Sequence, residues 1–362
     1  MEAKRKYRYE PDYAIAPGET LLEVCESMDM SKKELAARLE LTEQTINRIV
    51  KGIQPITYIT ANKLELVTGI AARFWNKLEA NYREQLAKMQ ETEQLSKDIS
   101  WLKKIPYNDL VKRGFIESSD NKTEQLRNIL QFFGVSSVVA WENIWKSPSL
   151  AARRSLCFAS HPETTSAWIR CGEVIASKID CEEYHYPTFK KVLTEIRKLT
   201  LTEPAIFLPQ MIELCRQAGV ALAFVPKMQK LPWNGASRWL SKSKALIMLS
   251  NRGKTEDKFW FSFFHEAAHI IQDSKKGLYI ADGSNDPIEI DADNFAADLL
   301  IPQPYNEIIQ NLTSQAQLIT LAQELSVSPG IVAGRYQYLS NNWHKFNNLI
   351  RSFNLAQPSL RN

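Results

Sequence analysis

The sequence predicts an α+β fold that is mainly helical, and two observations lead to this class. Over most of the chain, apolar residues recur three and four positions apart, which is typical of helices. Short β-like runs occur only after residue 201, as VALAFVP (220–226), ASRWLS (236–241) and ALIMLS (245–250). We therefore expect an all-α N-terminal domain, a helical middle region, and a C-terminal domain that combines a small β-sheet with helices.

The length of 362 residues is about twice that of a typical domain, so two or three domains are expected. The middle region begins with the polar stretch KMQETEQLSKD (88–98), which we interpret as a linker or an exposed helix. No internal repeat is evident. The expected domains are residues 1–88, 89–200 and 201–362.

The composition narrows the classes of function. With 44% hydrophobic and 24% charged residues, the chain resembles an ordinary globular protein, and its net charge of +4 permits but does not require contact with nucleic acid. The five cysteines show no CxxC spacing, so we expect neither a disulfide framework nor a cysteine-bound zinc. No secretory h-region follows the basic start, and no apolar run approaches about 18 residues. We expect a cytoplasmic protein without membrane contact.

The segment MSKKELAARLELTEQTINRIVKG (30–52) has the spacing of a helix-turn-helix. Ser31 is expected to cap the first helix, and Glu34 to complete a capping box. Thr42 is expected to cap the second helix and Gly52 to end it.

The outer face of this segment carries side chains suited to DNA. In a helix-turn-helix, the N-terminal side chains of the second helix reach base edges in the major groove. Gln44 and Asn47 can pair bidentately with a base, whereas lysine and arginine suit phosphates. The candidate DNA-binding residues are Lys32, Lys33, Thr42, Glu43, Gln44, Thr45, Asn47, Arg48 and Lys51. The alternative is an ordinary helical hairpin, which the balance of 14 Lys and Arg against 13 Asp and Glu in residues 1–88 favours.

Residues 17–88, from PGETLLEVCESMDMSKKELAARLELTEQTINRIVKG through ITANKLELVTGIAARFWNKLEANY, resemble the XRE-type helix-turn-helix proteins, and most of all the HigA-like antitoxins. The Pro-Gly opening and the FWNKLEANY close are the specific parts of this resemblance. The resemblance implies a homodimer that binds a palindromic operator in double-stranded DNA. It also implies a cognate toxin as a further partner.

The run FFHEAAHII (263–271) contains the pattern His-Glu-x-x-His. On a helix, His265 and His269 share one face and can bind one zinc ion, while Glu266 can act as a general base on water at that ion. The alternative is a buried helix that happens to carry two imidazoles. Two buried histidines without a shared partner would be costly, which favours a ligand role.

A third zinc ligand is expected from NDPIEIDADNFAADLLIP (285–302). Glu289 is the first choice, with Asp293 on the same helical face orienting a histidine from outside the ligand shell. Asp291 is the second choice and His344 a distant third. The alternative is structural, because Asp286 and Glu289 also fit a capping box at a helix start.

Four segments resemble the ImmA/IrrE family of metallopeptidases, over about residues 150–350. They are ASRWLS, ALIMLSNRGKTEDKFWFSFFHEAAHII, EIDADNFAADLLIP and SPGIVAGRYQY. The resemblance implies a gluzincin-like zinc peptidase that acts on helix-turn-helix repressors in stress, phage or mobile-element control. Its motif falls on His265, Glu266, His269 and Glu289, and the small Ala267–Ala268 pair departs from it modestly.

Two hypotheses follow for the whole chain. The first is a DNA-binding regulator whose zinc (Zn2+) endopeptidase domain cleaves a repressor, a partner or the chain itself. The second is a HigA-like antitoxin or repressor whose peptidase-like domain only senses or docks. In the first, ALIMLS (245–250) is positioned to hold a substrate strand, although a buried core strand is an equal alternative.

Overall fold

The computed structural model describes residues 13–146, 161–228, 231, 234–250, 254–272, 278–280 and 287–353, and of 278–280 only the backbone. The predicted helix cap Asp286 and the basic start of the chain lie outside these residues. The chain forms two compact units, Met1–Ile99 and Ser100–Asn362. The expected boundary at residue 88 falls inside a helix.

The N-terminal unit is all-α, as predicted. Its helices are α1 (Pro17–Ser27), α2 (Lys32–Arg38), α3 (Glu43–Val50), α4 (Tyr58–Thr68) and α5 (Ala72–Lys97). Leu21, Leu35, Ile46, Leu64 and Trp75 are buried at the centre of its hydrophobic core. Helix α5 is 26 residues long and continues through the polar stretch at 88–98, which we had interpreted as a linker or an exposed helix.

The turn between α2 and α3 is built by capping. The Ser31 and Thr42 hydroxyls accept backbone N–H groups at the starts of α2 and α3, as predicted. The capping box expected of Glu34 is replaced by another contact, since its carboxylate accepts from Arg38 at 2.6 Å, one turn along the helix. Arginine at this spacing offers a charged partner that the backbone N–H of Ser31 does not.

The C-terminal unit contains a four-stranded sheet of order β1-β3-β2-β4. Strand β1 (Val220–Phe224) is parallel to β3 (Ala245–Leu249), and β2 (Gly235–Trp239) is antiparallel to both β3 and β4 (Leu278–Ile280). The three predicted β-runs are therefore strands. Strand β4 was not predicted, because three residues carry no readable alternation.

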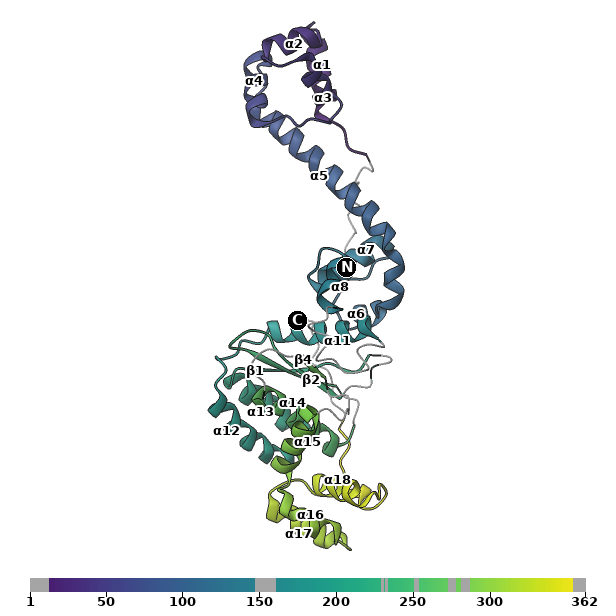
Figure 1. The fold of residues 1–362 in the computed structure, drawn as a ribbon, viewed down its shortest axis with the longest axis vertical. Helices are drawn as coiled ribbons and strands as arrows, with labels where there is room; N and C mark the ends of the chain where they lie inside the picture. Colours follow the sequence, from purple (N-terminus) through teal and green to yellow (C-terminus); the bar gives the residue numbers. More distant parts are fainter. Residues whose placement is uncertain are drawn as a thin grey trace, which may run out of the picture. The chain divides into compact units, whose positions relative to one another are not determined.

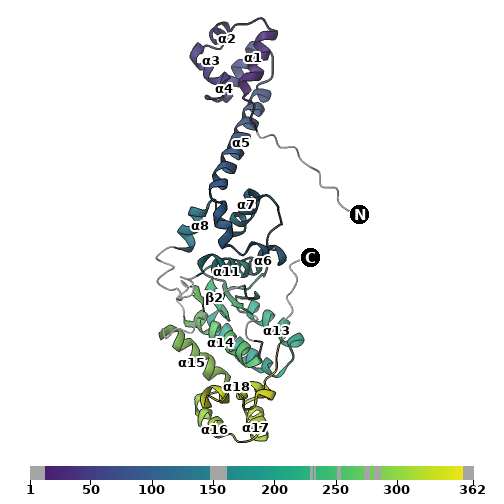
Figure 2. The same ribbon diagram turned by 90° about the vertical axis from the view of Figure 1, so that its right-hand side faces the viewer.

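Helices cover both faces of this sheet (Figure 1). On one face lies α11 (Pro162–Ser177), where Gly172 leaves room for the Met248 side chain of β3. On the other lie α13 (Pro204–Gln217) and α14 (Glu256–Gln272), as Figure 2 also shows. The other helices among the described residues of this unit are α6 (Tyr107–Lys112), α7 (Lys122–Phe133), α8 (Val138–Trp145), α12 (Tyr186–Lys198), α15 (Pro287–Leu300), α16 (Asn306–Gln310), α17 (Gln315–Leu325) and α18 (Pro329–Ser340). Short 3₁₀ turns lie at Leu199–Leu201, Gln303–Tyr305 and Asn347–Leu349, and another, Ile99–Lys104, begins at the last residue of the N-terminal unit.

Strand β3 is central and all five of its residues are buried. The substrate-strand hypothesis for 245–250 is therefore wrong, because both hydrogen-bonding edges of β3 are already occupied by β1 and β2. The alternative, a buried core strand, is correct.

The start of α14 is fixed by a residue nearly one hundred positions later. Glu256 is fully buried, and its carboxylate accepts the backbone N–H of Arg351 at 2.9 Å and the guanidinium of Arg351 at 2.7 Å. Arg351 also donates to the carbonyl of Thr200 at 2.6 Å. These charge-assisted bonds satisfy a carboxylate that would otherwise be costly to bury.

Candidate functional sites

The His-Glu-x-x-His sequence lies in the second half of α14, beneath the sheet. Packing of α14 against β2, β3 and α15 leaves His265 4% exposed, His269 1% and Glu266 0%. Phe263, Phe264, Ala267 and Ala268 are fully buried around them. The small alanine pair lets the helix approach its neighbours closely while the polar side chains gather on one side.

Three of the predicted ligand side chains converge at one point. The Nε2 atoms of His265 and His269 are 3.1 Å apart, and the Glu289 carboxylate lies 3.1 Å from the first and 3.3 Å from the second. Two ligand atoms on a tetrahedral zinc ion, each about 2.0–2.1 Å from the metal, are about 3.3 Å apart. Imidazole nitrogens and a carboxylate are also the donors that zinc prefers, so this donor set fits the ion.

Asp293 contacts the far side of His265. Its carboxylate lies 2.8 Å from Nδ1 of His265 and can accept a ring proton there, which orients Nε2 toward the ligand cluster. Burial lowers the pKa of His265, but its contacts with Asp293 and Glu289 outweigh burial and raise that pKa to about 10. Burial likewise raises the pKa of Glu289, and the two histidines more than reverse this, lowering it to about 2.

Glu266 points toward β2 and is enclosed there. A side chain at Gly235 would bring its Cβ to 2.7 Å from the Glu266 carboxylate, so only glycine leaves room for it. Among the described residues, neither carboxylate oxygen of Glu266 meets a hydrogen-bonding partner at normal geometry. Burial raises the pKa of Glu266, while the nearby His265, His269 and Ser237 side chains oppose that rise.

Other predicted site residues do not join this group. Asp291 is exposed on α15 and is not part of the cluster of His265, His269 and Glu289. His344 is also exposed and outside the cluster. Conversely, Gly235 and Ser237 were not proposed, because the i, i+2 spacing shows that they share a strand face but not what that face meets.

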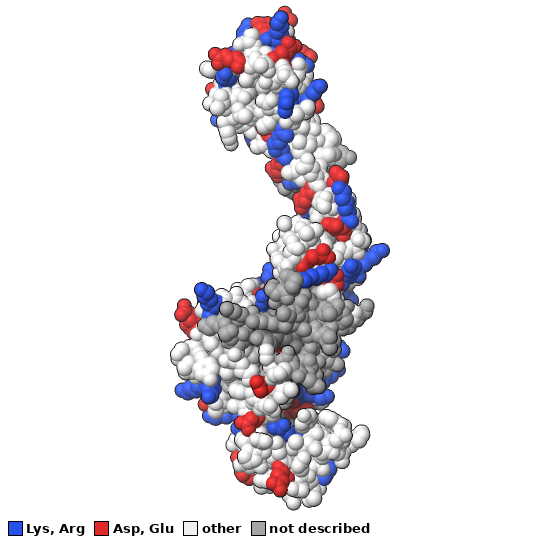
Figure 3. All heavy atoms as spheres, viewed as in Figure 1, with Lys and Arg blue, Asp and Glu red and all other residues white. Residues whose placement is uncertain are grey.

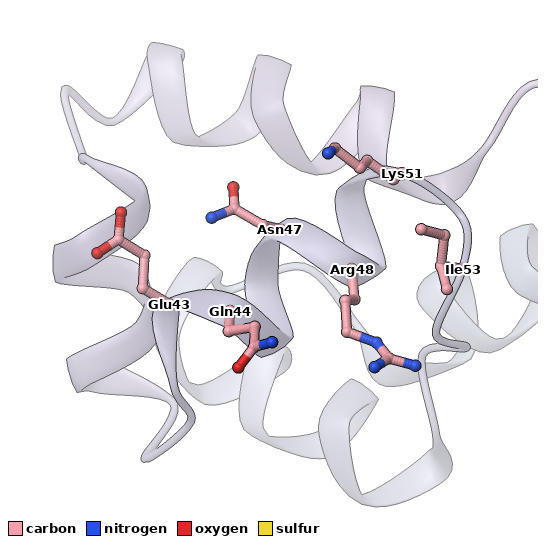
Figure 4. Close-up of a pocket in the computed structure, with 6 residues that line it drawn as sticks. All are labelled: Glu43, Gln44, Asn47, Arg48, Lys51 and Ile53. Atoms are coloured by element: carbon pink, nitrogen blue, oxygen red, sulfur yellow. The ribbon is translucent and has the colours of Figure 1, made fainter.

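The second candidate site is the outer face of α3. Glu43, Gln44, Asn47, Arg48 and Lys51 project from it, and with Ile53 they line a shallow open depression (Figure 4). Ile46 and Ile49, on the opposite face of the helix, are buried in the core. The structure thus presents five of the nine predicted DNA-binding residues on one open surface.

The other four do not line this depression. Thr42 accepts the N–H of Thr45 at 3.1 Å as the helix cap, and Thr45 is half-buried beside it. Lys32 is half-buried and Lys33 exposed in the first turn of α2. On the side of this unit that Figure 3 shows, Lys and Arg are interspersed with Asp and Glu, in line with the nearly equal counts in the sequence.

These two sites define a class of protein, in which a helix-turn-helix domain is joined to a domain with a metallopeptidase-type ligand cluster. Residues 21–75 match the family model described as Helix-turn-helix, and residues 219–336 match the one described as IrrE N-terminal-like domain, Peptidase_M78. The chain therefore carries an XRE-type helix-turn-helix domain and an M78 peptidase-family domain, which confirms both resemblances inferred from its sequence. None of the curated proteins compared matches this chain.

Three solved structures are similar to part of the chain. PA4674 of Pseudomonas aeruginosa, in complex with its operator DNA, is 32% identical over 21% of this chain and 82% of its own, with a TM-score of 0.20. The antitoxin HigA of the same organism, with the higBA promoter, is 30% identical over 23% and 90%, with a TM-score of 0.22. An addiction module antidote protein of the HigA family from Coxiella burnetii is 29% identical over 23% and 92%, with a TM-score of 0.22.

Within the described ranges, every helix is too short or too polar to cross a bilayer.

Proposed function

We propose that this protein is a DNA-binding transcriptional regulator whose M78 domain is a zinc-dependent endopeptidase. The observation that carries the proposal is the convergence of His265, His269 and Glu289 at separations of 3.1–3.3 Å, next to Glu266. A domain that served only for docking would have no use for a fully buried carboxylate beside this ligand cluster.

In this mechanism His265, His269 and Glu289 hold the ion, and Asp293 orients the His265 ring. A zinc ion there supplies Lewis-acid chemistry, polarising the substrate carbonyl and acidifying water. Glu266 takes a proton from the attacking water and delivers it to the leaving amine nitrogen. Burial raises the pKa of Glu266, which makes its carboxylate a stronger base toward water.

For DNA, we propose that α3 enters the major groove of an operator. Gln44 and Asn47 would read base edges, while Arg48, Lys51, Lys32 and Lys33 would contact phosphates. Glu43, Thr42 and Thr45 complete the set at the N-terminus of the helix. Binding as a homodimer, pairing with a cognate toxin, and cleavage of a helix-turn-helix repressor belong to the same proposal.

A second candidate function is that of a HigA-like antitoxin or repressor whose M78 domain is a non-catalytic sensor. The match of residues 21–75 to the helix-turn-helix family favours it as strongly as it favours the first. The first candidate requires the M78 domain to bind a catalytic zinc ion, whereas the second does not.

Zinc content of the purified full-length protein separates them. We expect one zinc per chain in the parent and in Glu266→Gln, and a loss of at least about tenfold in affinity in His269→Ala, which removes a ligand. Asp291→Asn is the matched control, since it removes an exposed carboxylate of α15 two residues from Glu289 and should keep the metal. Protein that takes up no zinc even after supplementation would overturn the endopeptidase and favour the sensor.

A further inference from the structure

Helix α5 has two halves with different surroundings. In the first half, Trp75 is fully buried, and Glu79 accepts the N–H of Ile56 at 3.0 Å and Nε of Arg83 at 2.7 Å. Arg83 in turn donates to the carbonyl of Gly52 at 3.0 Å. This half is therefore anchored to the loop that follows α3, the proposed DNA-recognition helix.

The second half contains eight consecutive exposed residues, 87–94, which we call the exposed segment. This is the longest run of exposed positions anywhere in the described part of the chain. A helix that packs on a core buries a position every three or four residues. More than two turns of α5 thus have no core to hold them in helical form.

The local interactions of the exposed segment are weak. The ion pairs Glu84–Lys88 (2.9 Å) and Glu93–Lys97 (3.4 Å) join exposed side chains, and such pairs add little. The Thr92 hydroxyl donates to the carbonyl of Lys88 at 2.8 Å, a side-chain bond that competes with the helical ladder and weakens it. All eight residues are already exposed, so local unfolding here brings little buried surface into water.

We propose that the exposed segment of α5, in this chain itself, is a substrate of the M78 domain, an inference that rests on the proposed peptidase function. An endopeptidase needs its substrate extended, so a helix is cut where it unwinds most readily. In the step, one peptide bond within 87–94 breaks. The hydroxyl of water joins the carbonyl carbon, and a proton joins the amine nitrogen.

The position of the cut determines what it releases. The buried core of the helix-turn-helix runs from Leu21 to Trp75, and the anchors Glu79 and Arg83 also precede the exposed segment. The N-terminal product therefore keeps its recognition helix folded while losing its covalent link to residues 100–362. Cleavage would uncouple DNA binding from the rest of the chain without destroying the DNA-binding fold.

The first test needs no peptidase activity. In metal-free, full-length protein, amide hydrogen exchange at residues 87–94 should be at least about tenfold faster than at residues 75–83 of the same helix. Equal protection along the two halves of α5 would overturn the inference.

The second test uses zinc-loaded full-length protein and mass spectrometry of the fragments. We expect a Glu266-dependent cut within 87–94, about fivefold faster in Lys88→Gly, which is the effect of about 1 kcal/mol of lost helix propensity. Lys191→Gly makes the same change at an exposed position of α12, whose other face is packed, and should leave the rate unchanged. Mixing the parent with tagged Glu266→Gln protein distinguishes cleavage of a second copy from cleavage within one chain.

Unfolded casein, offered to the same preparation, separates the two ways of failing. A Glu266-dependent cut in casein without a cut at 87–94, or with cuts elsewhere in the chain, overturns the inference and leaves the proposed function standing. No Glu266-dependent cut in either protein overturns both.

Discussion

Helices α2 and α3 and helices α17 and α18 form two hairpins with the same backbone turn, one in each unit. In both, a residue of the turn has a left-handed conformation: Glu40, with φ 56°, is the second residue after α2, and Ser326, with φ 53°, directly follows α17. The next N–H donates to a carbonyl five positions earlier, at 2.9 Å in one turn and 3.0 Å in the other. A hydroxyl, from Thr42 or Ser328, then caps the second helix.

The correspondence extends to the side chains of the core. A spacing of 286 residues separates Leu35 from Leu321, Ala36 from Ala322, Leu39 from Leu325 and Thr42 from Ser328. These few shared positions do not amount to an internal repeat of the sequence, because the two second helices differ on their outer faces. At that spacing Gln44, Asn47, Arg48 and Lys51 of α3 correspond to Gly330, Ala333, Gly334 and Gln337 of α18.

This difference in side-chain size decides what each second helix contacts. The long polar side chains of α3 keep its outer face open (Figure 4). The glycines of α18 instead let that helix press against the start of α14, where Gly330 faces Glu256 and Gly334 faces Asp257. One hairpin geometry thus serves an open surface in the first unit and internal packing in the second.

The largest effect is expected where the packing is tightest. In Gly330→Ala the new Cβ would lie 1.9 Å from the Glu256 carboxylate, which Arg351 prevents from moving aside. We expect the free energy of unfolding of the C-terminal unit to fall by about 3 kcal/mol, as measured by denaturant unfolding. The equivalent change in α3, Gln44→Ala, should alter stability by less than about 0.5 kcal/mol. If Gly330→Ala and Gln44→Ala lowered the free energy of unfolding equally, the difference in packing between α18 and α3 would be contradicted.

An intermediate effect is expected on DNA, and only from the first hairpin. For an operator obtained by in vitro selection, Gln44→Ala should weaken binding by about tenfold or more and relax the sequence preference. Lys51→Ala should weaken binding to all sequences alike. It should also reduce the slope of log affinity against log salt concentration by about one. Gln337→Ala, the equivalent of Lys51→Ala, should leave affinity and salt dependence unchanged in fluorescence anisotropy. A loss of DNA binding in that variant would show that α18 also takes part.

The smallest effect on stability is expected at the left-handed turn residues, Ser326 and Glu40. Glycine adopts positive φ without strain, so Ser326→Gly should stabilise the C-terminal unit by up to about 1 kcal/mol. Glu40→Gly should gain less at neutral pH, because it also removes a 2.9 Å ion pair with Lys63.

The pH dependence of unfolding tests this smallest difference. The hydrogen bond with Lys63 lowers the pKa of Glu40 below its ordinary value, so the ion pair stabilises the fold above that value and is lost as pH falls through the lowered pKa. For each variant, the gain is the rise in melting temperature of its own unit relative to the parent. Acid that protonates Glu40 should therefore bring the gain of Glu40→Gly closer to that of Ser326→Gly. If the difference between these two gains in melting temperature widened in acid, this account would be contradicted.

How much the sequence predicts depends on the range of the interaction. His265 and His269 were expected to share one face of a helix, and they do so on α14, because spacing on a single helix fixes which residues share a face. The Glu289 and Asp293 positions were also indicated by spacing. The glycine behind Glu266 was not, since it lies on a strand whose position only the folded sheet determines. The Arg38 partner of Glu34 was also not predicted, and the burial of β3 was one of two alternatives that only the order of strands in the sheet decided.

The bond between Glu256 and Arg351 has a consequence for the order of events during synthesis. Helix α14 carries the candidate metal ligands, yet the charge at its first turn is satisfied only when a residue 95 positions further along has been made. A nascent chain that has produced the helix-turn-helix, the sheet and α14 still lacks this partner. The helix-turn-helix unit can therefore fold well before the helix that carries the candidate metal ligands is completed.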